Sequence, residues 1–146
     1  MNLSPHFTIA ELIYSQTASA RQINNAVPEA LLGNLKILAE GLEQVRALLN
    51  APLHINSGYR CKALNEAVGG SPTSAHMEGF AADFTCAQFG TPLEIVREIE
   101  QSGIKFDQCI AEGKWVHISF DPQLRQRLLT AHFDASGKAT YTRGLT

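Results

Sequence analysis

Two segments of the chain carry residue types that could do chemistry together. The first runs Ser74-Ala-His76-Met-Glu-Gly-Phe-Ala-Ala-Asp83, and the second is Trp115-Val-His117. Two imidazoles and one carboxylate are a ligand set that hydrolytic zinc sites use, and three protein ligands leave the fourth tetrahedral position free for water. Because a bound divalent metal lowers the pKa of such a water to about 7, these residue types suggest a catalytic metal site.

Strand periodicity predicts how both segments present these side chains. In residues 115–120 the alternation places His117 on the face opposite an apolar row, where it is available to a metal or a substrate. In residues 80–84 it places Asp83 opposite two phenylalanines, and Gly79 lets the backbone pass close to a bulky group. A buried, unpaired Asp would be costly, and either a metal ion or an arginine would relieve that cost. The residues by themselves leave both explanations open.

The length and composition indicate a single globular domain over residues 1–146, with a core at about 5–130 followed by a C-terminal tail that could be loose. The chain has 45% hydrophobic and 18% charged residues and a formal net charge of -2. It has no basic run for nucleic acid and no apolar stretch for membrane insertion, and we expect a monomer. Three cysteines at wide spacing predict reduced residues in or near the core. The N-terminus lacks the pattern of a secretory signal, so we expect the protein to be cytoplasmic at synthesis.

Helical and strand patterns along the chain predict an α+β fold. Thr8 and Glu11 have the spacing of a capping box, and Pro28 suits the first turn of a long helix whose apolar residues recur every three or four positions. The predicted helices cover residues 9–14, 29–49, 61–68 and 92–102, with a further turn of helix within 122–129. The predicted strands cover 53–56, 80–84, 107–111 and 115–120, with a hairpin loop at 112–114. The tail from His132 is either a last strand or a loose arm. We therefore expect a small, mostly antiparallel sheet with helices packed on one side.

The two motifs together resemble the zinc D,D-peptidases of the M15 family, and more narrowly its phage-associated, D-Ala-D-Ala carboxypeptidase-like branch. The segments Ser57-Gly-Tyr-Arg60 and Phe106-Asp-Gln108 fit the resemblance as well, which extends over roughly residues 5–121. Five fixed residue types within ten positions, followed by Trp-x-His, make a specific pattern. The resemblance implies the fold shared by Hedgehog proteins and D,D-peptidases.

The resemblance also implies the roles of the site residues. His76, Asp83 and His117 would be the ligands of a Zn²⁺ cofactor. Arg60 would hold a carboxylate or carbonyl of the substrate, because its planar guanidinium suits that task, although a structural ion pair is the alternative. The supporting residues that complete the set are Ser74, Tyr59 and Trp115, and for Ser74 a capping hydroxyl is the alternative.

The general base is implied less directly. The broader M15 pattern places an acidic residue three positions before the last histidine, where this chain has Lys114. Glu112 is the nearest acidic residue, and members of the narrower branch look similar at this position. A hairpin could bring its carboxylate over the metal, whereas a solvated turn glutamate is the alternative.

The function implied by the resemblance is metal-assisted hydrolysis of an amide bond in the stem peptide of peptidoglycan. The enzyme would be a D-Ala-D-Ala carboxypeptidase or an endolysin-like endopeptidase, acting on the wall after release or as part of a virion. Two alternatives stay open. One is a non-catalytic cell-wall-binding or phage structural module that keeps the fold, and the other is a hydrolase of a different amide.

Overall fold

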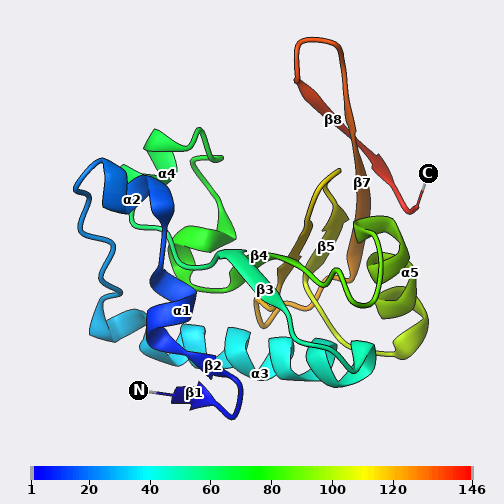
Figure 1. Cartoon of the computed structure of the whole chain (residues 1–146), viewed down its shortest axis with the longest axis horizontal. Coiled ribbons are helices and arrows are strands. Elements are labelled where there is room, and N and C mark those ends of the chain that lie inside the picture. Colours follow the sequence, from blue (N-terminus) through cyan, green and yellow to red (C-terminus); the bar gives the residue numbers. More distant parts are fainter. Residues whose placement is uncertain (1, 146) are drawn as a thin grey trace.

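A six-stranded sheet forms the centre of the computed structural model, which describes residues 2–145 (Figure 1). Its strand order is β3-β4-β6-β5-β7-β8, and each neighbouring pair is antiparallel except β5 and β7, which are parallel. The strands are β3 (His54–Ser57), β4 (Ala81–Thr85), β5 (Gln108–Ala111), β6 (Val116–Ser119), β7 (Arg127–Phe133) and β8 (Ala139–Arg143). The fold is therefore α+β with a mostly antiparallel sheet, as the sequence predicted.

Two amphipathic helices cover one face of this sheet. In α3 (Leu32–Leu49) the buried residues recur every three or four positions, so a single apolar stripe faces the strands. Helix α5 (Pro92–Ser102) starts at a complete capping box of Thr91 and Glu94, and it ends at Gly103, whose positive φ terminates the helix. The two helices contact each other and, with the inward residues of β4 and β6, enclose the core.

The shorter elements gather at the β3 edge of the sheet, far from the edge formed by β8 (Figure 1). The first of these elements form a two-stranded ribbon that contacts α3. These elements are β1 (Asn2–Ser4), β2 (Phe7–Thr8), α1 (Ile9–Ile13), α2 (Gln16–Ala20), η1 (Glu29–Leu31), α4 (Lys62–Ala67) and η2 (Ala75–Glu78). Over the described residues, no helix combines the length and apolar character needed to cross a membrane.

The prediction of a turn of helix within residues 122–129 is wrong. The chain makes a turn after Asp121 and then enters β7 at Arg127, which pairs in parallel with β5. Leu124 and Gln126 have φ values of 42° and 55°, so this segment cannot continue as a right-handed helix. Backbone hydrogen bonds from Gln126 and Arg127 to the carbonyls of Phe106 and Asp107 fasten it to the start of β5 instead.

The C-terminal tail forms a strand, one of the two alternatives that its sequence left open. Strands β7 and β8 pair from Leu129 with Arg143 to Phe133 with Ala139, and the hairpin projects away from the body of the molecule (Figure 1). The three cysteines are free, and Cys86 and Cys109 are buried.

Candidate metal centre

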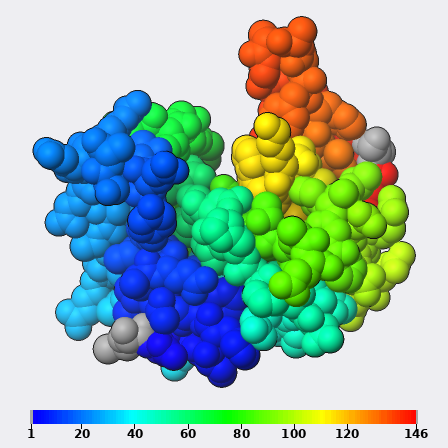
Figure 2. All heavy atoms as spheres, viewed as in Figure 1, coloured from blue at the N-terminus to red at the C-terminus, as the bar shows by residue number. Residues whose placement is uncertain are grey.

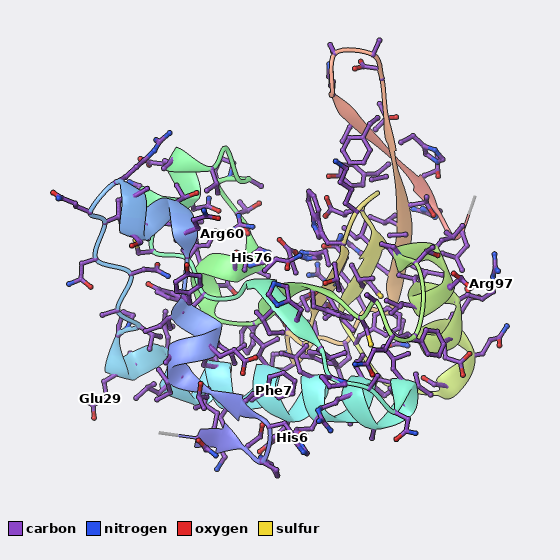
Figure 3. All side chains as sticks on the ribbon, in the orientation of Figure 1. His6, Phe7, Glu29, Arg60, His76 and Arg97 are labelled. Carbon is purple, nitrogen blue, oxygen red and sulfur yellow. The ribbon has the colours of Figure 1, made fainter. Side chains whose placement is uncertain are left out.

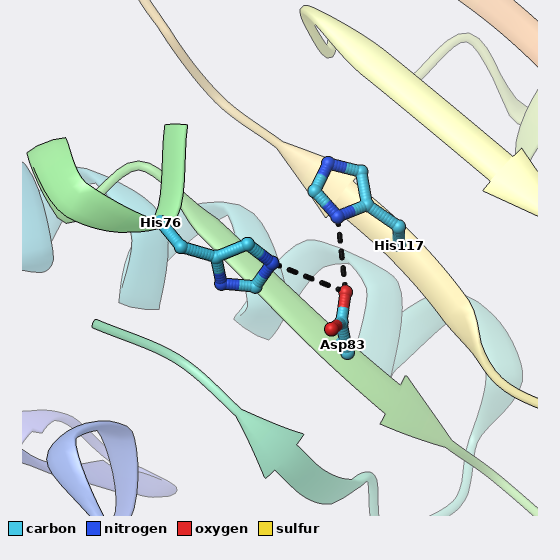
Figure 4. Close-up of side chains that lie close together, drawn as sticks. All are labelled: His76, Asp83 and His117. Carbon is cyan, nitrogen blue, oxygen red and sulfur yellow. Dashed lines mark hydrogen bonds and ion pairs between the residues drawn. The ribbon is translucent and has the colours of Figure 1, made fainter. Parts of the chain in front are cut away.

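The three predicted metal ligands lie together at the centre of the sheet (Figure 4). Asp83 of β4 and His117 of β6 are directly paired in the strand register, and His76 comes from η2, the short helix before β4. Asp83 Oδ1 lies 3.3 Å from His76 Nε2 and 3.0 Å from His117 Nδ1. Within the described residues these three side chains are the group whose ligand atoms could all bind one metal ion, since they lie within 4.8 Å of one another.

The donor atoms fit a divalent metal in their chemistry as well as their positions. His76 Nδ1 lies 2.7 Å from the backbone carbonyl oxygen of Gly58, and donation to that oxygen leaves Nε2 with its lone pair directed at Asp83. Metal ligands must be deprotonated to bind. Burial lowers the pKa of His76 and so favours its neutral form. Burial raises the pKa of Asp83, but His76 and His117 outweigh that effect and hold it below its ordinary value of 3.8.

Local backbone geometry explains two glycines around the centre. At Gly58 a side chain would collide with the backbone oxygen of Leu12, so glycine lets the chain pass α1 and present its carbonyl to His76. Gly79 ends η2 at a φ of 81°, in the left-handed region that favours glycine. A methyl group there would make only ordinary contacts of 3.6 Å. The prediction that Gly79 permits a close approach is therefore wrong, because its backbone conformation is the reason for a glycine.

Arg60 stands beside the centre and is held at three points. Its guanidinium donates to Ser57 Oγ at 3.1 Å, to Asn65 Oδ1 at 3.0 Å and to Asp83 Oδ2 at 3.4 Å. The structure thus contains the ion pair that was the alternative explanation for this residue. A guanidinium has five N–H donors, however, so these three bonds leave two for a substrate. Arg60 lines the same cleft as the ligands and lies next to His76 in the middle of the molecule (Figure 3).

Glu112 lies on the other side of the centre, directly after β5. Its backbone N–H donates to the carbonyl of Trp115, which closes the turn between β5 and β6. Glu112 lines the cleft, whereas Lys114 is exposed and outside the lining. Burial raises the pKa of Glu112 above its ordinary value of 4.5, and the negative charge of Asp83 adds to this effect. A carboxylate with a raised pKa is a stronger proton acceptor.

The three predicted supporting residues occupy different positions. Ser74 accepts a hydrogen bond from the backbone N–H of His76 and caps η2, and it also lines the cleft. Trp115 is half-buried and lines the cleft. Tyr59, in contrast, is 5% exposed, packs in the hydrophobic core and is not part of the cleft lining. The structure therefore gives Tyr59 a packing environment rather than a place at the centre.

The centre opens into a cleft of about 910 Å³ between two parts of the molecule. One wall comes from the segment around α4 and η2, and the other comes from β5, β6 and β7 with Tyr141 of β8. In Figure 2 the surface is hollowed between the green residues of the first wall and the yellow and orange residues of the second.

Two residues of the site were not predicted from the sequence. Asn65 is 2% exposed and orients Arg60, and its own amide donates to the carbonyl of Ser71. Nothing in the sequence around Asn65, which lies in a short polar helix, predicts that this side chain is buried. Tyr141 lies in a polar tail far from the motifs, and only the pairing of β8 with β7 brings it to the cleft.

Comparison with known proteins identifies the family. The sequence model of peptidase M15 matches residues 5–119, well over half of the chain. No curated protein matches the chain. The chain belongs to the peptidase M15 family, and its buried His–Asp–His cluster fits a metallopeptidase.

Proposed function

We propose that the protein is a zinc-dependent peptidase that hydrolyses an amide bond in the stem peptide of peptidoglycan. The observation that carries this proposal is the convergence of His76, Asp83 and His117 at an open cleft, with Glu112 on one side and Arg60 on the other. Two histidines and one carboxylate suit zinc in hydrolytic sites. The choice of peptidoglycan rests on the resemblance to the D-Ala-D-Ala carboxypeptidase-like branch of the family.

Zinc held by the three ligands would acidify a water molecule and polarise the scissile carbonyl. Glu112 accepts the proton of the attacking water and returns it to the leaving amine, a role that its raised pKa favours. Arg60 uses its two remaining N–H groups to hold a carbonyl or carboxylate oxygen of the peptide. Its bonds to Ser57 and Asn65 keep the guanidinium in place before the substrate arrives.

The direct test uses purified protein reconstituted with zinc, with two substrates: a soluble stem pentapeptide that ends in D-Ala-D-Ala, and purified sacculi. Mass spectrometry of the products separates release of free D-Ala from internal cleavage, and so separates carboxypeptidase from endopeptidase. We expect Glu112→Gln to retain zinc and to lower kcat by about 10²- to 10⁴-fold. Glu78→Gln is the matched control, since Glu78 is an exposed glutamate in η2 outside the cleft lining.

Three results would contradict parts of this proposal. Full activity of Glu112→Gln would remove Glu112 from the mechanism. If the zinc-loaded protein cleaved neither substrate, the proposal of a peptidoglycan peptidase would be contradicted. Binding of the zinc-loaded protein to sacculi without any product would instead support the non-catalytic wall-binding module.

A further inference from the structure

The C-terminal hairpin of β7 and β8 lies outside the residues matched by the family, yet it reaches the candidate site. The match ends at residue 119. Strand β7 pairs with β5 up to Ala111 and Thr130, so the hairpin leaves the sheet next to Glu112, the first residue after β5. In Figure 2 the yellow residues around this turn lie directly against the orange residues of the hairpin.

One face of the hairpin carries two aromatic residues toward the Glu112 turn. Phe133 pairs with Ala139, and Ala131 pairs with Tyr141. Paired residues of an antiparallel ladder, and residues two positions apart, share a face. Phe133 and Tyr141 are 48% and 50% exposed, so burial in the core does not explain why large side chains stand here.

Both aromatic residues contact the turn that carries Glu112. The ring of Phe133 packs against Gly113, where an added methyl group would lie 2.9 Å from Cε2 of the ring. Tyr141 lines the cleft together with Glu112 and His117, and its hydroxyl is near enough to the Glu112 carboxylate to lower the pKa of Glu112 against the effect of burial. The hairpin thus approaches the turn at two places: Phe133 lies on the backbone of the turn at Gly113, and Tyr141 lies near the side chain of Glu112.

We propose that Tyr141 is a positioning residue that holds the Glu112 carboxylate toward the metal ligands, and that Phe133 braces the turn beneath it. This inference rests on the proposed function, because it assigns Glu112 the part of general base. A carboxylate in a short turn has several accessible rotamers, and a proton acceptor must lie within hydrogen-bond reach of the reacting water. The Tyr141 hydroxyl selects one of these rotamers, and the packing of Phe133 on Gly113 limits movement of the turn.

The test compares Tyr141→Phe with the wild-type protein on the stem pentapeptide. We expect kcat to fall about tenfold while KM stays within about twofold and zinc content is unchanged, because the hydroxyl acts on Glu112 and not on the substrate or the metal. Tyr14→Phe is the matched control. Tyr14 is 64% exposed and outside the cleft lining, so its substitution should leave kcat and KM unchanged.

A second measurement does not depend on activity. In Phe133→Ala we expect faster amide hydrogen exchange at Gly113 and Lys114, with exchange in β4 unchanged, because the ring no longer packs on the turn. Unchanged exchange at both positions would overturn the bracing role of Phe133.

The kinetic outcomes separate this inference from the proposed function. An active wild-type protein whose Tyr141→Phe variant has the same kcat would overturn the positioning role and leave the peptidase intact. A raised KM with unchanged kcat would also overturn it, since the hydroxyl would then bind substrate. A zinc-loaded wild-type protein that releases no product would overturn the proposed function and this inference with it.

Discussion

Asp83 connects the groups of the candidate centre. Its Oδ1 faces both His76 and His117, and its Oδ2 faces Arg60 at 3.4 Å. A buried carboxylate without partners would take up a proton, but the two histidines hold the pKa of Asp83 below its ordinary value despite its burial. The sequence left open whether a metal or an arginine compensates this Asp. The structure places both an arginine and a set of metal-ligand atoms around it.

Substitution of the ligands tests this geometry through metal content. We expect about one zinc per chain in the wild-type protein, and clear loss of zinc in His76→Ala and Asp83→Asn, because each removes one of three ligands. His54→Ala is the matched control, since His54 is an exposed histidine of β3. Elemental analysis after dialysis measures the ratio. Equal zinc content in all four proteins would contradict the assignment of these ligands.

At the scale of elements, the centre depends on how closely α3 packs under the sheet. Gly41 faces Phe120, the residue after β6, and a methyl group at Gly41 would lie 2.5 Å from the phenyl ring. Phe120 donates its backbone N–H to the carbonyl of Phe80, just before β4. The helix therefore supports both strands that carry metal ligands, at a point where only glycine fits.

Two glycines of α3 provide a matched pair for this packing. We expect Gly41→Ala to destabilise the fold by about 1–3 kcal/mol, because the buried ring has to move. Gly33 lies in the same helix with no atom within 4 Å of an added methyl group, so Gly33→Ala should stabilise the fold by about 0.5–1 kcal/mol through helix propensity. Urea unfolding measures both values. If the free energy of unfolding changed in the same direction in both variants, this explanation would be contradicted.

At the scale of the whole molecule, one ion pair fastens the second wall of the cleft. Asp107, which is 3% exposed, accepts hydrogen bonds from Arg125 Nε and Nη2, each at 2.8 Å, and from the Arg125 backbone at 2.9 Å. These bonds tie the connection at residues 121–126 to the start of β5. Strand β7, which leads into the hairpin that carries Tyr141, begins directly after this connection and pairs with β5.

The attachment should make the stability of the fold depend on pH. The hydrogen bonds from Arg125 hold the pKa of Asp107 below its ordinary value of 3.8. A group with a lowered folded-state pKa contributes stability above its unfolded pKa and loses it as the pH falls through the folded value. We therefore expect Asp107→Asn to be less stable than the wild-type protein at about pH 6, and the difference to shrink at about pH 3. Urea unfolding with a chelator present keeps metal occupancy equal, and a difference that grows on acidification would contradict the prediction.

Much of the fold was predictable because its signals are local. The capping residues Thr8 and Thr91 and the apolar spacing in α3 predicted helices that the structure contains, with ends shifted by a few residues. The turn at residues 112–114 follows from two strand patterns close together in the sequence. The segment at 122–129 was mistaken for helix because a parallel pairing with β5, which is invisible in its own sequence, determines its conformation.

The sequence by itself determined the candidate ligands, since alternation along β4 and β6 dictates which face Asp83 and His117 occupy. Only the tertiary structure decided which other groups surround them. In the folded protein Tyr59 packs in the core and Arg60 donates a hydrogen bond to Asn65. Tyr141 lies near Glu112 in the same cleft. Periodicity expresses contacts between near neighbours in the chain, whereas the second wall of the cleft depends on strand order and packing between distant segments, which no local pattern encodes.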